Sequence, residues 1–142
     1  MEMNINMMAI LVAVVANFFF GFLWYTVLFG KAWAVEMGFD ITVKPPASVM
    51  IKGIVIMVIG NFLMAYVFAH NMKAWTYVDG YDTMDAMGNI MSAAVFTWLG
   101  FYVPTDLGVV AWERKTWRLF FINTIYHLIM LVIAAVVLYY MQ

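Results

Sequence analysis

Four polar side chains stand near the centres of four long apolar segments: Asn17, Asn61, Thr97 and His127. If these segments are membrane-spanning helices, the four side chains occupy one layer at mid-depth. Hydrocarbon offers them no hydrogen-bond partner, so each must meet another polar group inside the protein. The layer could be a polar site or conduit in which His127 is the only titratable member. The simpler interpretation is a set of interhelical hydrogen bonds that fix helix register, each worth about 1 kcal/mol or less.

Asp106 is a further candidate for proton chemistry. It follows Pro104, which we expect to end or kink the third apolar segment because proline has no amide hydrogen. At that position the carboxylate could accept a proton at the mouth of a channel. Alternatively, it caps a helix or pairs with a nearby basic residue such as Arg114 or Arg118.

The two histidines, His70 and His127, are the only imidazoles available to a cofactor. Their predicted depths differ by roughly nine residues, about 14 Å along a helix, so one haem held by both is not expected within a single chain. Many of the 14 methionines are predicted to gather near His70, and thioether with imidazole suits Cu(I), although methionine is also a flexible apolar filler. The chain has no cysteine, no Gly-rich phosphate loop and no Gly-x-Ser-x-Gly motif. We therefore expect no catalytic residue, no metal and no cofactor.

Composition predicts the elements that must position these groups. Of the 142 residues, 67% are hydrophobic and 11% are charged, whereas about 25% is typical of soluble domains. A chain this short has too much surface per volume to hide so many apolar side chains from water. We predict a single all-α transmembrane domain over residues 1–142, a four-helix bundle with spans at about 5–29, 49–70, 86–103 and 119–140. The net charge of −1 gives no basic field that would attract nucleic acid.

The positions of lysine and arginine predict the orientation. All seven except Lys73 fall on the side of the first and third loops: Lys31, Lys44, Lys52, Arg114, Lys115 and Arg118. The positive-inside rule then places those loops in the cytoplasm and both termini on the non-cytoplasmic side of a bacterial cytoplasmic membrane. Residues at the helix ends are expected to anchor the protein at the lipid headgroups: Trp24, Tyr25, Lys31, Trp33, Trp112 and Trp117.

Several stretches resemble one family of proteins. The pattern Gly21-x-x-Trp24-Tyr25-x-x-Leu28-Phe29-Gly30-Lys31-x-Trp33 resembles the opening of the small bacterial membrane proteins grouped as domain of unknown function family 1761. The similarity continues into that family's third and fourth helices, at Trp98-Leu99-Gly100-Phe101, Glu113-Arg114-Lys115 and Leu119-Phe120-x-Ile122-Asn123-x-x-Tyr126. The resemblance spans nearly the whole chain and implies a four-helix integral membrane protein. It implies no activity and supplies no catalytic residue.

Three functional hypotheses follow from these patterns. The leading one is a non-enzymatic assembly or accessory protein in the lipid bilayer, acting as a homo-oligomer or as a subunit of a larger membrane complex, because helix-packing residues outnumber chemical groups. The alternative is a small channel or transporter component with a polar path through Asn17, Asn61, Thr97 and His127. A weaker alternative is a haem- or copper-binding membrane subunit that uses His127 or His70.

Overall fold

The structure, a computed structural model, describes residues 4–142, which form helices and turns without a β-strand. Four helical stretches are long and apolar enough to cross a membrane: Met7–Leu28, Ala47–Trp75, Ala86–Trp112 and Trp117–Met141. The predicted all-helical fold with four candidate membrane spans is therefore confirmed. Short polar side chains cap the N-termini of three helices. Asn6, Asp85 and Thr116 each accept a hydrogen bond from a free backbone amide of the first turn.

Two of the four stretches are composite helices. The first consists of α1 (Met7–Phe22) followed by a π-helical segment, η1 (Leu23–Leu28). The third consists of α4 (Ala86–Thr97), a second π-helical segment, η3 (Trp98–Tyr102), and α5 (Val103–Trp112). The other two are the uninterrupted helices α3 (Ala47–Trp75) and α6 (Trp117–Met141).

The third stretch does not end near Val103, where the sequence predicts its end. Pro104 lies in the first turn of α5, directly after η3. Because the wider π turn accommodates a residue without an amide hydrogen, the helix continues to Trp112. The predicted first loop also contains structure, a short helix α2 (Gly30–Met37) that ends at Gly38 with φ 77°. A turn of 3-10 helix, η2 (Tyr81–Thr83), lies in the loop between α3 and α4.

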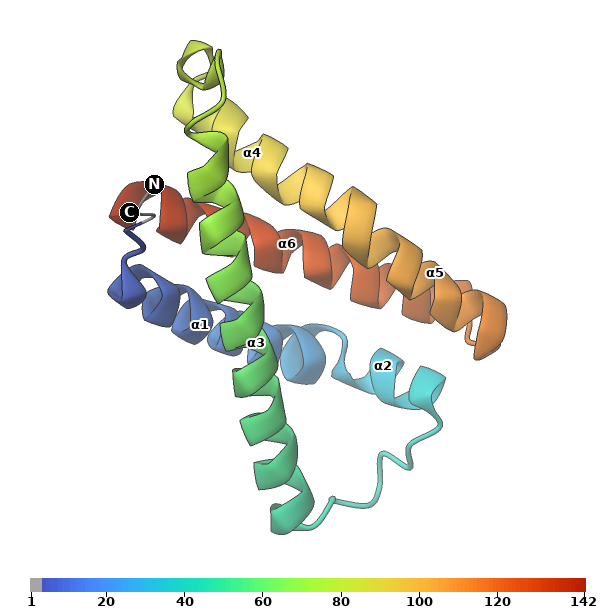
Figure 1. Cartoon of the computed structure of the whole chain (residues 1–142). Coiled ribbons are helices and arrows are strands. Elements are labelled where there is room, and N and C mark those ends of the chain that lie inside the picture. The colour runs from blue at the N-terminus through green and yellow to red at the C-terminus, as the bar shows by residue number, and fades with distance from the viewer. Residues whose placement is uncertain (1–3) are drawn as a thin grey trace.

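Helix α6 is the centre of the molecule. It contacts α1, α2, α3, α4 and α5, and Figure 1 shows it between α1 on one side and α4–α5 on the other. The start of α1 and the end of α6 lie at one end of the molecule, where the Asn6 side chain donates a hydrogen bond to the Met141 carbonyl over 2.6 Å. The first and third loops meet at the opposite end, because Glu36 of α2 pairs with Arg118 (3.6 Å) and also accepts a hydrogen bond from Thr116.

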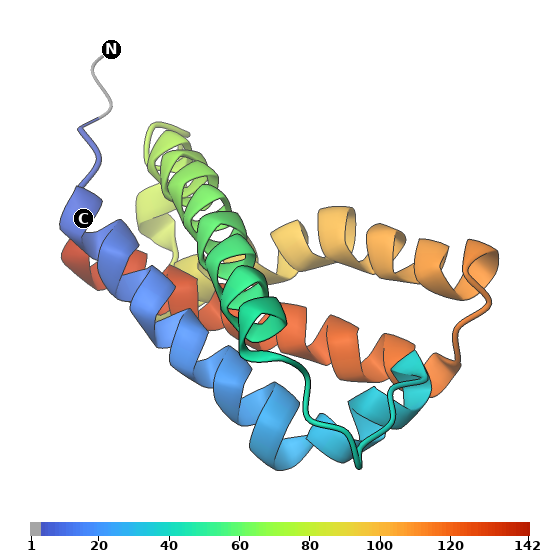
Figure 2. The same cartoon turned by 90° about the horizontal axis from the view of Figure 1, so that it is seen from below.

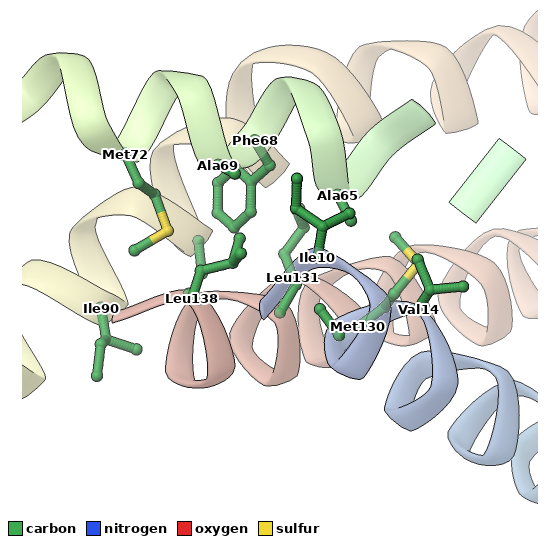
Figure 3. Packing of buried hydrophobic residues seen from close by; sticks show 14 of the residues in the cluster. Ile10, Val14, Ala65, Phe68, Ala69, Met72, Ile90, Met130, Leu131 and Leu138 are labelled. Atoms are coloured by element: carbon green, nitrogen blue, oxygen red, sulfur yellow. The ribbon is translucent and has the colours of Figure 1, made fainter. Parts of the chain in front are cut away.

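Small buried residues lie on the helices that form the core. Ala9 and Ala13 of α1, Ala65 and Ala69 of α3, and Ala134 and Ala135 of α6 are fully buried. Small side chains let membrane helices approach closely and gain van der Waals contact. Larger apolar side chains fill the space around them; Figure 3 shows Ile10 and Val14 of α1 beside Met130, Leu131 and Leu138 of α6, with Phe68 of α3 above.

Helix α3 crosses the other long helices instead of running alongside them (Figures 1 and 2). Its buried residues, which begin at Ala65, all lie in its C-terminal half. Every residue from 47 to 60 is exposed within the chain, and a Cβ added at Gly53 or Gly60 would meet nothing within 4 Å. The N-terminal half of α3 therefore has no partner in residues 4–142 and is available to lipid or to another protein.

Candidate functional site

An aspartate and a histidine form a pair within two of the candidate membrane-spanning helices. The Nδ1 atom of His127 lies 2.8 Å from Oδ2 of Asp106, and the two side chains are 23% and 9% exposed. This distance is typical of a charge-assisted hydrogen bond in which the imidazole N–H donates to the carboxylate. The pair joins α5 to the middle of α6.

Two tyrosine rings pack beside His127. The ring centroid of Tyr102 lies 4.7 Å from that of His127, and the Tyr126 ring lies 5.5 Å from it. Tyr126 in turn contacts Tyr25 at 4.8 Å, and the Tyr25 hydroxyl donates a hydrogen bond to Oδ1 of Asn123 over 3.0 Å. These residues are called the Asp–His cluster below: Tyr25, Tyr102, Asp106, Asn123, Tyr126 and His127.

The two π-helical segments fix α6 next to this cluster. In η1, the Trp24 indole N–H donates to the Ile122 carbonyl over 3.1 Å. In η3, the Trp98 indole N–H donates to Thr124, 2.8 Å from its carbonyl and 3.0 Å from its hydroxyl. π turns inside α-helices occur frequently at functional sites, and here each one brings a tryptophan to the α6 backbone on either side of Asn123.

The π turn in η1 also changes which residues face the interior. Along a regular α-helix, Asn17, Gly21, Trp24 and Leu28 would form one stripe. Asn17 and Trp24 are buried, but Leu28 is 56% exposed, because a wider turn shifts every later side chain around the helix axis.

Gly21 is required by the packing of Tyr126. A Cβ at Gly21 would lie 2.9 Å from the Tyr126 hydroxyl oxygen, closer than the two atoms can approach. Tyr126 is 5% exposed and stacks on Phe20 with an interplanar angle of 3°, so it has little room to move away. The glycine of the motif at the start of the chain thus positions one ring of the Asp–His cluster.

The four residues of the predicted mid-depth layer separate into different contacts. Nδ2 of Asn17 donates to Oδ1 of Asn61 over 3.4 Å, and Nδ2 of Asn61 donates to the Val14 carbonyl over 3.1 Å. Within residues 4–142, no hydrogen bond joins Thr97 or His127 to either asparagine. The asparagines fix the crossing of α1 and α3, His127 belongs to the Asp–His cluster, and Thr97 lines a cavity between α3 and α4.

The predicted interface anchors occupy two kinds of position. Trp24 is 7% exposed and lies inside the bundle, so its hydrogen bond to α6 accounts for it without a lipid surface. Tyr25 and Trp33 are half-buried, with ring centroids 5.6 Å apart. The remaining three are exposed and free to contact headgroups: Lys31, Trp112 and Trp117.

The partner of Asp106 is the feature that sequence reasoning missed. Arg118, one of its predicted partners, pairs with Glu36 instead, and Asp106 pairs with His127. The prediction ended the third span near Pro104, which left Asp106 outside the membrane. A span that runs to Trp112 places Asp106 inside it, and such a buried carboxylate requires a polar partner in the bundle.

Residues 4–142 contain no group of three or more His, Cys, Asp and Glu side chains that could hold a metal ion. His70, the second candidate ligand, is a hydrogen-bond partner of its own helix: its Nδ1 lies 2.8 Å from the Tyr66 carbonyl. Its ring also packs on Tyr66, with centroids 4.4 Å apart.

The sequence profile of one family, described as a protein of unknown function (DUF1761), matches residues 8–139. The chain belongs to this family. The match covers α1 through nearly all of α6, including both π-helical segments and the whole Asp–His cluster. No curated protein and no solved structure matched the chain. Membership in DUF1761 confirms the predicted family and carries no assigned activity.

Proposed function

We propose that this DUF1761 protein binds and transfers protons in a membrane, as a small channel or transporter component. The observation that supports this role is the pair of Asp106 and His127 within the candidate spans. Ionisable side chains are costly inside a bilayer, and where they occur they commonly form proton relays or ion paths. An imidazole hydrogen-bonded to a carboxylate can exchange one proton between the two groups without creating an isolated buried charge.

The position of the pair favours access from the end of the molecule that carries the basic loops. Asp106 precedes Trp112, the last residue of α5, by six residues, about 9 Å along the helix. The phenols of Tyr25, Tyr102 and Tyr126 are hydrogen-bonding groups in the same cluster. Under the positive-inside rule this end faces the cytoplasm of a bacterial cell, and both termini face outward.

Proton flux in liposomes tests this role. The protein is reconstituted into liposomes that enclose a pH-sensitive dye. A pH step is then applied while valinomycin and a fixed potassium gradient clamp the membrane potential. We expect Asp106→Asn and His127→Gln to reduce the flux by tenfold or more, because each removes one member of the pair. His70→Gln is the matched control, since it removes the other histidine and should leave the flux unchanged. Equal flux in wild type and both cluster variants would refute the proposal.

A second candidate role is assembly, and the unpartnered half of α3 favours it. Residues 47–60 are exposed within the chain and carry Gly53 and Gly60 on an apolar surface, where small residues permit close helix contact. In this role the N-terminal half of α3 packs against a second copy or against another subunit of a membrane complex. Neither role requires an enzymatic activity.

Cysteine cross-linking tests the assembly role, because the chain has no cysteine of its own. We expect Gly53→Cys to give disulfide-linked dimers in the membrane, and a cysteine at Val15, exposed on α1, to give none. Equal cross-linking at the two positions, or a monomeric mass in mild detergent with no copurifying protein, would contradict assembly through α3.

A further inference from the structure

A cavity of about 540 Å³ lies between the C-terminal half of α3 and the composite helix α4–η3. This volume falls within the range of about 300–1,000 Å³ common for small-molecule pockets. The cavity lies apart from the Asp–His cluster, none of whose residues line it. Seven of its twelve lining residues are aromatic or sulfur-containing: Phe68, Met72, Trp75, Tyr81, Met84, Phe96 and Phe101.

Three of the five polar residues that line the cavity lie toward the end where α3 and α4 join through the loop. Asn71 near the end of α3, Tyr81 in the loop, and Asn89 near the start of α4 all line this end. Phe101 lies twelve residues beyond Asn89, about 18 Å along the helix. Ser92 and Thr97 also line the cavity, farther along α4 beside Ala93 and Phe96. The cavity is therefore more polar at the loop end and more apolar toward Phe101, a profile that suits an amphiphile with a medium-length chain.

Asn89 carries an acceptor without a partner. The residue is 6% exposed, and its Oδ1 accepts no hydrogen bond within residues 4–142. Its Nδ2 donates over 3.5 Å to the Met84 carbonyl, at the limit of hydrogen-bond length. A buried acceptor left unsatisfied costs about 1–3 kcal/mol. The terminal torsion of asparagine has a broad energy profile, and Asn89 is among the residues that line the cavity.

The charges around the polar end favour a cation. Between residues 71 and 89, the sequence that joins α3 to α4 carries three acidic residues, Asp79, Asp82 and Asp85, and one basic residue, Lys73, which gives a formal charge of −2. None of these four residues lines the cavity itself. No lysine, arginine or histidine lines the cavity. Trp75 and Tyr81 offer ring faces that attract an ammonium group. Burial, followed by the neighbouring Tyr139 and Asp82, raises the pKa of Tyr81.

We propose that the cavity binds a lipophilic primary amine from the membrane. The ammonium N–H groups donate to Oδ1 of Asn89 near the acidic loop, and the alkyl chain extends along α4 toward Phe96 and Phe101. The site needs both features of the headgroup: an N–H donor for the amide oxygen and a positive charge for the acidic and aromatic surroundings. This binding role is separate from proton transfer at the Asp–His cluster.

Native mass spectrometry of the full chain in a non-ionic detergent tests the proposal with four probes of equal chain length. Dodecylamine has both the charge and the donor, dodecyltrimethylammonium has the charge alone, dodecanol has a donor without charge, and laurate has the opposite charge. We expect one dodecylamine per chain, with the other three bound at least about tenfold more weakly. Equal binding of the trimethylammonium compound or laurate would overturn the site, and equal binding of dodecanol would overturn its preference for a cation.

Variants locate the bound amine. Asn89→Leu should weaken dodecylamine binding about tenfold, whereas Met91→Leu, on the same helix but outside the cavity wall, should leave it unchanged. Ala93→Phe places a ring into the cavity and should abolish binding in a chain whose helical circular dichroism is unchanged. Asp106→Asn should bind dodecylamine as wild type does. Undiminished binding in both Asn89→Leu and Ala93→Phe would contradict the proposal.

Discussion

The imidazole of His127 and the carboxylate of Asp106 are 2.8 Å apart in the interior of a helix bundle. The pair joins the third and fourth candidate spans, and it brings together the two groups that sequence reasoning had assigned to different places. Each group alone would be a costly buried polar atom, and together they satisfy one another. Both the stability and the proposed function of the protein depend on this contact.

Removal of one member of the pair should destabilise the protein more than removal of both. Asp106→Ala leaves the His127 N–H without an acceptor, and we expect a loss of about 3 kcal/mol in the free energy of unfolding. In the double variant that combines Asp106→Leu and His127→Phe, no polar group of the pair remains, so the loss in the free energy of unfolding should be smaller. Reversible unfolding in mixed micelles measures both values. A double variant less stable than Asp106→Ala would contradict a mutually compensating pair.

Gly21→Ala should lower stability by about 1–3 kcal/mol, because the added methyl group meets the Tyr126 hydroxyl in a packed core. Tyr126→Phe removes that oxygen, so the double variant should recover part of the loss. Gly53→Ala is the matched control: its added methyl group meets nothing within 4 Å. Thermal unfolding in detergent distinguishes the variants. The prediction is refuted if Gly21→Ala and Gly53→Ala have the same effect.

Asn61→Leu should cost about 1 kcal/mol, because it removes the acceptor of Asn17 and the donor to the Val14 carbonyl. The loss of stability should be smaller in the double variant that combines Asn17→Leu and Asn61→Leu, because it leaves no unpaired side-chain amide in the α1–α3 contact. Steric-trapping or micelle unfolding measurements report the difference. If the two asparagines act independently, their effects will simply add.

The orientation can be tested by cysteine labelling in intact cells. A cysteine near Asp79, in the loop between α3 and α4, should react with a membrane-impermeant maleimide added outside. A cysteine near Lys115, between α5 and α6, should react only after the membrane is opened. The reverse pattern would show that both termini face the cytoplasm.

Long apolar segments allowed the helical fold and the four candidate spans to be predicted from the sequence, and the motif that begins at Gly21 indicated the family. Internal irregularities were not predictable in the same way. Proline usually ends or kinks a helix, and the sequence contains no signal that a π turn would carry the third span past Pro104. The predicted end near Val103 left Asp106 outside the third candidate span, and its contact with His127 was therefore not predicted. The layer of four polar residues was inferred from depth alone, and depth does not determine which face of a helix meets which neighbour. Asn17 and Asn61 do meet, whereas Thr97 faces a cavity.

Hydrogen exchange at the Nδ1 proton of His127 tests the central claim most directly. In His70→Gln, His127 is the only histidine, so ¹⁵N NMR in lipid bilayers observes a single imidazole. A proton-transferring pair predicts that the Nδ1–H signal disappears promptly when D₂O replaces water, and that Asp106→Asn changes its chemical shift. An Nδ1–H signal that persists in D₂O as long as the buried backbone amides of α6 would show that the pair only holds α5 and α6 together.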